Sequence, residues 1–233
     1  MFGIFTGVLA NVATVILGTA AGLLFKTEKL KIIGERIFQV FALYVLVMGV
    51  EGALGIEQPL LVLASIIIGV AAGELLDIDR GFTRLGDALQ AKFTKGGDDH
   101  FSAGFMQASM LFCIGSMTIL GALQSGLENQ HSIYLTKSVL DLVSSMTLAM
   151  GFGIGVGFSA LTILLFQGLL VLGASTLAPI LTAATIAASV QTGSLFLIAI
   201  AFNMLGLTKL KVANFLPAMF IPMLWQAIQL LIK

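Results

Sequence analysis

The sequence predicts an all-α fold, a polytopic transmembrane helical bundle that forms a single integral membrane domain over residues 1–233. Three observations support this fold class. First, 58% of the residues are hydrophobic, only 10% are charged and the mean hydropathy is +1.05, whereas soluble domains carry about 25% charged residues. Second, several apolar runs reach the roughly 20 residues that an α-helix needs to cross a bilayer. Third, the sequence lacks the short segments of alternating hydrophobicity that are typical of membrane β-barrels.

The apolar runs predict about eight spans, and the pattern is compatible with seven to nine. The first run has no basic segment in front of it and is too long for a typical cleaved signal peptide, so we expect it to be the first span. Polar segments separate most of the other runs. In chain order, the expected spans are 3–25, 37–55, 59–76, 103–125, 136–157, 159–174, 193–208 and 214–232.

Two segments between these spans differ from the spans in composition: one is rich in small residues and the other is polar. Residues 175–193 contain Pro179 and many small side chains, so they fit a re-entrant or interfacial segment, or an additional span. Residues 77–100 form the largest polar segment, which we expect as a cytoplasmic, partly amphipathic loop. Its apolar residues at i, i+4 and i+8 predict a helix lying on the membrane surface, with a solvated loop as the alternative: Leu85, Leu89 and Phe93.

Basic residues predict the orientation, because Lys and Arg are enriched in short cytoplasmic loops. With eight spans and the N-terminus outside, every basic residue except Lys137 and Lys233 lies on the cytoplasmic side. One further span would move Lys209 and Lys211 to the outside. The formal net charge is +0, so nothing suggests a nucleic-acid partner.

Two stretches resemble each other and suggest an internal repeat of a two-span unit. ILGTAAGLLFKTEKLKIIGERI aligns with IIGVAAGELLDIDRGFTRLGDAL, and the second span of each copy ends in Gly-Ala-Leu. Chance similarity between apolar helices is the alternative. Each copy also holds two glycines one turn apart, which let helix backbones approach closely in lipid. We interpret these as helix-packing residues within or between subunits: Gly18, Gly22, Gly69 and Gly73.

The stretch KSVLDLVSSMTLAMGFGIGVGF is the best candidate for a polar site. Lys137 and Asp141 are four residues apart and can pair across one helical turn. We expect Lys137 at the outer interface, where it can snorkel, and Asp141 about one turn deeper. Ionisable groups inside a membrane are costly and indicate an ion, proton or substrate path; an ion pair that anchors the helix end is the alternative. Ser144 and Ser145 follow one turn later.

Four closely spaced glycines come next: Gly151, Gly153, Gly155 and Gly157. They permit close packing on two sides of the helix or local unwinding, as in the interrupted helices of transporter sites. Three further polar residues in apolar runs are weaker candidates for the path: Asn11, Glu51 and Asn203. Interhelical hydrogen bonding explains such residues equally well.

The sequence contains no catalytic or nucleotide-binding motif of the types HExxH, GxSxG, CxxC or GxxxxGK[ST]. We therefore expect no enzyme activity, no catalytic residue, no metal site and no cofactor. The single cysteine, Cys113, excludes an intrachain disulfide and reads as a small packing residue.

Four stretches are similar to a known family: GVLANVATVILGTAAGLL, IGVAAGELLDID, LTKSVLDLVSSMTLA and LGLTKLKVANFLPAMF. Together they resemble the bacterial membrane proteins called the domain-of-unknown-function 554 family, over nearly the whole chain. The resemblance implies a multi-span protein of the bacterial cytoplasmic (inner) membrane and carries over no substrate or catalytic residue.

These observations lead to two hypotheses of different classes. The first is a membrane transport protein that moves an unidentified small solute or ion without its own ATP hydrolysis. The second is a non-transporting scaffold that acts through helix packing, partner binding and oligomerisation, for example as a homo-oligomer. In both, the lipid bilayer is the surrounding medium.

Overall fold

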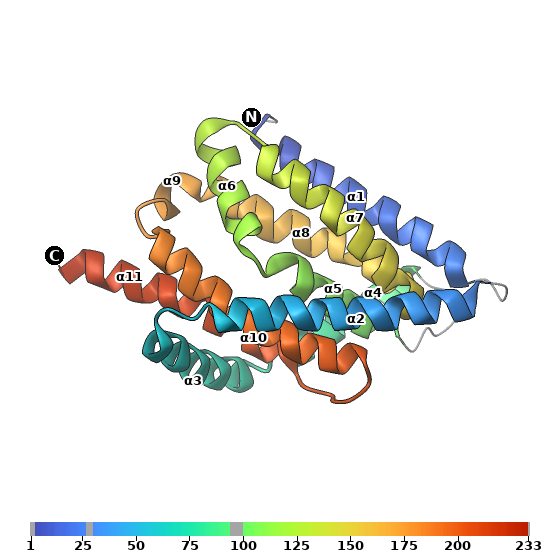
Figure 1. Cartoon of the computed structure of the whole chain (residues 1–233). Helices are drawn as coiled ribbons and strands as arrows, with labels where there is room; N and C mark the ends of the chain where they lie inside the picture. Colours follow the sequence, from blue (N-terminus) through green and yellow to red (C-terminus); the bar gives the residue numbers. More distant parts are fainter. Residues whose placement is uncertain (1–2, 27–29, 94–99, 233) are drawn as a thin grey trace. The chain divides into compact units, whose positions relative to one another are not determined.

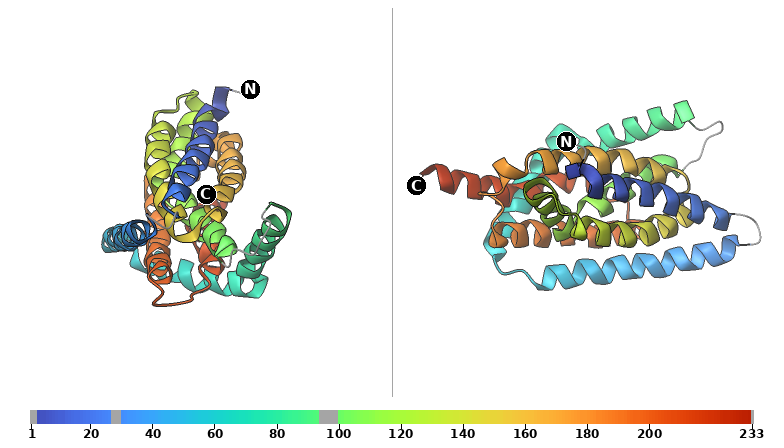
Figure 2. Two further views of the ribbon diagram at one scale, coloured as in Figure 1. Left: turned by 90° about the vertical axis from the view of Figure 1, so that its right-hand side faces the viewer. Right: turned by 90° about the horizontal axis from the view of Figure 1, so that it is seen from above.

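The computed structural model describes residues 3–26, 30–93 and 100–232, and every regular element in these ranges is a helix (Figures 1 and 2). Six of the described helices are long and apolar enough to cross a membrane. A seventh candidate is the pair α5 (Phe101–Cys113) and α6 (Ser116–Glu128), which is bent by 64°. The protein is therefore a multi-pass α-helical membrane protein. Residues 94–99 of the expected 77–100 loop lie outside the described ranges.

The chain divides into two compact units. Unit 1 comprises residues 1–41, 80–113 and 117–174, and unit 2 comprises residues 42–79, 114–116 and 175–233. The division falls within α2 (Lys31–Leu54), whose first part belongs to unit 1 and whose second part belongs to unit 2. We describe each unit by itself.

Unit 1 is built around α1 (Thr6–Leu23), α7 (Ser132–Phe152) and α8 (Gly155–Leu172). Helix α1 packs along α7 (Figure 1) and also contacts α8, while α5 packs against α8 and α7. The short helices η1 (Gly3–Phe5) and η2 (Leu24–Lys26) flank α1. The three central helices thus surround a shared interior.

Glycines explain why α1 and α7 lie so close. A methyl group built on Gly18 would lie 2.1 Å from Ser145 Oγ, and one on Gly22 would lie 2.1 Å from the Met146 carbonyl oxygen. Only glycine fits at such backbone contacts. The order of these contacts shows that α1 and α7 run parallel. Gly157 near Thr19 shows, in the same way, that α8 runs antiparallel to α1, because Gly168 lies near Phe5.

Helix α4 (Ile78–Phe93) has one apolar and one polar face, as the sequence predicted for part of segment 77–100. It is not among the candidate spans of the described chain. Within unit 1, Phe82 packs against Phe105 of α5, and Phe93 packs against Phe158 of α8, with ring centroids 5.9 Å and 5.4 Å apart. Ser102 also donates a hydrogen bond to Asp87, so α4 is held against the membrane helices.

Unit 2 contains the second part of α2, α3 (Pro59–Leu76), α9 (Ala174–Leu177, from its second residue on), α10 (Ala183–Met204), η3 (Val212–Phe220) and α11 (Ile221–Ile232). Glycines again set the closest approach. A methyl group on Gly69 would lie 2.1 Å from Ala218 Cα, and one on Gly73 would lie 1.8 Å from the Asn214 carbonyl oxygen. Helix α3 therefore packs directly on the backbone of η3.

The helix boundaries differ from the predicted spans at three places. The predicted spans 136–157 and 159–174 are α7 and α8, whose boundary lies at Gly153, where φ is +79°. The predicted span 193–208 begins earlier, at Ala183, so most of the segment 175–193 is the first part of α10. The predicted span 103–125 is the bent pair α5 and α6.

Candidate functional site: a buried polar cluster in unit 1

An ion pair lies inside unit 1. Lys137 Nζ donates to Asp141 Oδ2 at 2.5 Å, and both side chains are only 8% exposed. The two residues lie one turn apart on α7, as the sequence predicted. Lys137 does not snorkel to the interface as expected, because α7 begins at Ser132 and its second turn is covered by other helices. Its ammonium instead lies 5.8 Å from the centre of the Phe112 ring.

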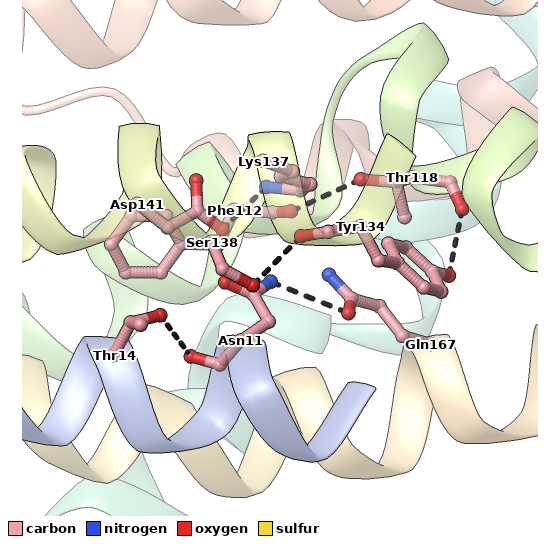
Figure 3. A network of polar contacts seen from close by, with 9 residues as sticks. All are labelled: Asn11, Thr14, Phe112, Thr118, Tyr134, Lys137, Ser138, Asp141 and Gln167. Atoms are coloured by element: carbon pink, nitrogen blue, oxygen red, sulfur yellow. Dashed lines mark hydrogen bonds and ion pairs between the residues drawn. The ribbon is translucent and has the colours of Figure 1, made fainter. Parts of the chain in front are cut away.

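Two amide side chains complete the cluster from other helices. Asn11 of α1 donates from Nδ2 to Oε1 of Gln167 of α8 at 3.3 Å, and both residues are fully buried. Asn11 also lies within hydrogen-bonding reach of the Asp141 carboxylate. Figure 3 shows Asn11 pointing from α1 toward α7, with the Gln167 amide beside it. The helices α1, α7 and α8 thus contribute polar side chains to one buried cluster in unit 1.

Two polar atoms of this cluster have no hydrogen-bond partner among the described residues: Asn11 Oδ1 and Gln167 Nε2. Buried polar groups in native proteins are nearly always paired, and an unpaired one costs about 1–3 kcal/mol. The cluster therefore has one free acceptor, Asn11 Oδ1, and one free donor, Gln167 Nε2, among the described residues.

The cluster lies near one end of unit 1. Asn11 and Lys137 follow the starts of α1 and α7 by five residues, and Gln167 precedes the end of α8 by five residues. At 1.5 Å per residue each lies about 8 Å from its helix end, and Asp141 lies about 14 Å from the start of α7. Because α1 and α7 are parallel and α8 is antiparallel, these three ends coincide.

The last turn of α5, just before the break that separates it from α6, lies beside the ion pair of unit 1. Gly115, with φ of +138°, sits in this break and is assigned to unit 2. Thr118 at the start of α6 donates from its hydroxyl to the Phe112 carbonyl at 3.3 Å, and its own carbonyl accepts from the Tyr134 hydroxyl at 2.9 Å. The first bond satisfies a carbonyl at the end of α5 that a continuous helix would have satisfied, and the second joins α7 to the first turn of α6. Broken helices at membrane depth are tolerated where they are buried in protein or line a cavity.

An apolar layer closes the cluster toward the nearer end. It takes one buried residue from each of four helices: Val8, Ala122, Tyr134 and Val171. Each lies three or four residues, about one turn, nearer to the end than a polar residue of its own helix: Asn11, Thr118, Lys137 and Gln167. The partly buried side chains of Ile4, Phe5 and Leu170 pack against this layer.

The remaining predicted residues of α7 and α8 surround the cluster without joining it. Ser145 is buried, donates to the Leu142 carbonyl and contacts Gly18, while Ser144 is half-buried. Gly151 packs against the Phe38 ring, and Gly155 against the Phe101 carbonyl. Gly153 ends α7, and Gly157 lies near Thr19. Of these four glycines only Gly153 lies in the turn between α7 and α8, and the other three permit close packing of the helix ends.

Two weaker candidates belong to unit 2, so they are not part of this cluster within unit 1. Glu51 is exposed on α2. Asn203 closes a loop: its Oδ1 accepts from the Leu210 N–H at 2.9 Å and from Thr208 Oγ1 at 2.7 Å, and its Nδ2 donates to the Leu210 carbonyl. Asn203 thus has a local structural role that its sequence position did not reveal.

Three features at or next to the site were not predicted from the sequence: Tyr134, Gln167 and the break between α5 and α6. Gln167 was visible as an amide within an apolar run, but only the fold shows that it meets Asn11. Gly115 was the signal for the break, although it was one glycine among 26. Tyr134 gave no signal, because its role depends on Thr118 of another helix.

A separate hollow lies on unit 1 between α1 and α8. It has a volume of about 500 Å³ and is lined almost entirely by apolar side chains, among them Val12, Ile16 and Leu164. It contains no charged group. The polar cluster is therefore the better candidate for a site that binds a polar solute or an ion.

These features define a class: a multi-pass helical membrane protein with a charged, incompletely hydrogen-bonded site buried between its helices. The comparisons agree with the membrane part of this class, since one relative is described as a membrane protein. Residues 6–227 match the family described as "Protein of unknown function (DUF554)", and the chain belongs to this family.

Two bacterial relatives cover nearly the whole chain. It is 27% identical over 220 residues to "Uncharacterized membrane protein YdfK" of Bacillus subtilis (strain 168), covering 93% of each chain. It is also 27% identical over 222 residues to "Uncharacterized protein YqgA" of Escherichia coli (strain K12), covering 93% of this chain and 94% of the relative. No solved structure matches the chain.

Proposed function

We propose that the protein moves a small solute or ion across the bacterial inner membrane without its own ATP hydrolysis, and that the path passes through the polar cluster of unit 1. The observation that carries this proposal is the Lys137–Asp141 ion pair, buried among membrane helices. Taking two charges out of water costs several kcal/mol per ion, and an apolar pair of similar volume is often as stable or more stable. Charged residues inside membrane proteins typically mark substrate, ion or proton paths.

The surroundings of the ion pair support a binding role over a purely structural one. Around a purely structural ion pair, we would expect every neighbouring polar atom to be hydrogen-bonded. Here, Asn11 Oδ1 and Gln167 Nε2 have no hydrogen-bond partner among the described residues. The adjacent α5–α6 break resembles the interrupted helices of secondary transporters. In the proposed cycle, Asp141 binds a cation or proton, and nearby hydroxyl and amide oxygens complete its coordination.

We further propose eight spans with the N-terminus outside. The eight are the six long apolar helices, the bent pair counted as one, and α7. Helix α7 has 21 residues, enough for about 31 Å, and it packs along the membrane helix α1. Its polar content is explained by the site it carries. This topology places the basic residues of α4 and of the α10–η3 connection inside: Arg80, Arg84, Lys92, Lys209 and Lys211.

The two-span repeat is a further proposal about the origin of the fold. In its favour, the glycine pairs of both copies lie against backbone, in unit 1 and in unit 2 respectively. After the glycine pairs, the structures of the two copies differ. Gly34 and Gly86 occupy the same place in the alignment, but Gly34 lies in α2, which continues to Leu54, whereas Gly86 lies in α4, which ends at Phe93.

The alternative function is a scaffold that acts by oligomerising or holding a partner. Such a scaffold would bind its partner through the helix faces of α1 and α3 that carry the paired glycines. Both faces are occupied by contacts inside the chain, Gly18 with α7 and Gly69 with η3. A homo-oligomer would therefore use other, lipid-facing surfaces, and this observation favours transport.

The experiment is solute and ion flux into sealed liposomes that contain the purified protein. A panel of small ions and organic solutes is compared for wild type, Asp141→Asn and the exposed-carboxylate control Glu57→Gln. We expect at least one solute to enter with wild type and Glu57→Gln, and its uptake to vanish with folded Asp141→Asn. Flux that is unchanged in Asp141→Asn would contradict the proposed path, and no flux for any solute would favour the scaffold.

A further inference from the structure

The residues of the polar cluster indicate which kind of ion it binds, a metal cation or a proton. This inference rests on the proposed function. Metal cations need several oxygen ligands, usually including carboxylates. Among the described residues no group of three or more His, Cys, Asp or Glu side chains could hold a metal ion. The single carboxylate of the cluster is already in contact with an ammonium group. A metal ion would have to displace Lys137 and would find one carboxylate.

A proton has none of these requirements. It binds one Asp141 oxygen, forms one O–H bond and turns the carboxylate into a neutral carboxyl group. The Lys137 ammonium keeps its own protons and loses its ion partner, so the net charge of the pair changes from zero to +1. No cavity is needed, which agrees with side chains that are 8% exposed.

The unpaired amide oxygen beside the ion pair fits the protonated form. Asn11 lies within reach of Asp141, and its Oδ1 has no donor among the described residues. A protonated Asp141 carries the O–H donor that this oxygen lacks. A half-turn of the Asn11 amide about Cβ–Cγ would bring the two together and would release the Asn11 Nδ2 bond to Gln167 Oε1. A matching half-turn of the Gln167 amide would then let its unpaired Nε2 donate to Asn11 Oδ1. We propose that Asp141 is a proton-binding site, and that the ion which the protein moves or uses for coupling is the proton.

Few other groups could take the proton instead. On α7 the other titratable side chains near Asp141 are Lys137 and Tyr134, and on α5 the titratable side chain near the ion pair is the buried Cys113. The polar side chain that faces Asp141 from α1 is the amide of Asn11, which bonds in turn to the Gln167 amide of α8, and neither amide titrates. Asp141 is thus the one carboxylate of the cluster within the described chain.

Infrared difference spectroscopy tests this directly, because a protonated carboxyl group has a C=O stretching band that a carboxylate lacks. Purified protein in lipid is compared between about pH 4 and pH 9, the range over which perturbed carboxyl groups titrate. We expect a band that appears on acidification in wild type and Glu57→Gln and is missing in Asp141→Asn. The exposed carboxylates provide a common background that the difference between variants removes.

The outcomes separate this inference from the proposed function. Identical difference spectra for wild type and folded Asp141→Asn would show that Asp141 stays in one protonation state, which overturns the proton site. If a panel solute still crosses liposomes through an Asp141-dependent path, the transport proposal survives that result without the proton. If Asp141→Asn does not fold, Asp141→Glu is used, and a shift of the acid band on this substitution is the expected result.

An independent observation concerns access to the cluster. The ring of Tyr134 lies in a slot between two glycines: methyl groups built on Gly7 and Gly121 would lie 2.7 Å and 2.6 Å from Tyr134 side-chain atoms. Its hydroxyl donates to the Thr118 carbonyl of α6. Tyr134 therefore fills the apolar layer and joins α7 to the helix that begins at the break.

We infer that this layer is the closed gate of the site, with Tyr134 as its central residue. Helix α6 contributes Ala122 to the layer and starts just after Gly115. A rotation of α6 about its first residues would break the Tyr134–Thr118 bond and separate the layer. The polar cluster, one turn below, would then be open to the nearer end of unit 1.

The native cysteine reports on this gate. Cys113 is the single cysteine of the chain, is buried and lies near the ion pair, so its reaction with a charged, membrane-impermeant thiosulfonate measures entry into the site. We expect Tyr134→Ala to accelerate labelling about 10-fold or more, since closed proteins populate open states at about 0.1–10%. Leu140→Ala, which truncates an exposed side chain of α7, should leave the rate unchanged.

Tyr134→Phe keeps the ring and removes only the bond to Thr118, and it should give a smaller acceleration. This variant carries the test if Tyr134→Ala does not fold. Labelling that is as slow in both folded variants as in wild type would overturn the gate. This readout needs no flux, so it is independent of the transport assay.

Discussion

At the scale of single residues, the central feature is a lysine and an aspartate that neutralise each other inside a membrane protein. The sequence predicted this pair from the spacing of Lys137 and Asp141, because residues four apart share a helix face. It could not predict that Lys137 is buried, since this depends on Phe112 of another helix. It also could not bring Asn11 and Gln167 together, because they are separated by most of the chain.

Removing one charge should cost more stability than removing both. Lys137→Met leaves Asp141 buried without its counter-charge, and breaking a buried pair in this way costs about 3–5 kcal/mol. The double variant Lys137→Met/Asp141→Leu leaves no charge, and we expect its stability to be equal to or above that of wild type. Thermal unfolding of the three proteins in the same lipid mixture measures this order. A double variant less stable than the single one would contradict a net cost of burying the pair.

Asp79, at the start of α4 and outside the membrane spans, should make stability depend on pH. Burial raises the pKa of its carboxyl above the ordinary value, while Lys211 acts in the opposite direction. Because the folded state holds the proton more tightly than the unfolded state, stability is lost as the pH rises from the ordinary value through the raised one. Asp79→Asn should remove this loss.

The Asp79 measurement is Tm at a series of pH values for wild type, Asp79→Asn and the exposed control Glu57→Gln. The advantage of Asp79→Asn over wild type should grow across that pH window and vanish below it. A variant whose Tm is lower than that of wild type at neutral pH would show that the charged carboxylate stabilises the fold.

At the scale of helices, close glycine contacts set the packing. The glycine spacing in the sequence predicted close approach at Gly18 and Gly69, and in the structure an added methyl group would collide with Ser145 and with Ala218. The sequence did not identify the partner helices. Helix ends were also harder to predict, because the glycines from 151 to 157 are compatible with either a break or a packed helix, and only Gly153 adopts positive φ.

Gly18→Ala should destabilise unit 1 by about 1–3 kcal/mol, the usual cost of overpacking, because the new methyl group would collide with the backbone of α7. Gly81→Ala in α4 is the matched control, since nothing lies within 4 Å of its added methyl group. It should stabilise by up to about 1 kcal/mol through helix propensity. Thermal unfolding compares them, and equal effects of the two substitutions would contradict the α1–α7 contact.

At the scale of the whole molecule, composition was enough to predict a polytopic helical membrane protein. The six long apolar helices confirm that class, and the bent α5–α6 pair raises the number of candidates to seven. The polar helix α7 is the element that hydropathy describes least well, because Lys137, Asp141 and its serines lower its apolar content. We propose that this helix crosses the membrane and that its polar residues form part of the site.

The most direct test of the account is flux through the doubly neutral variant Lys137→Met/Asp141→Leu in sealed liposomes, using whichever solute or ion wild type moves. We expect this variant to fold with at least the stability of wild type and to move no solute or ion. Flux at the wild-type rate through this folded variant would contradict the claim that the polar cluster of unit 1 is the transport site.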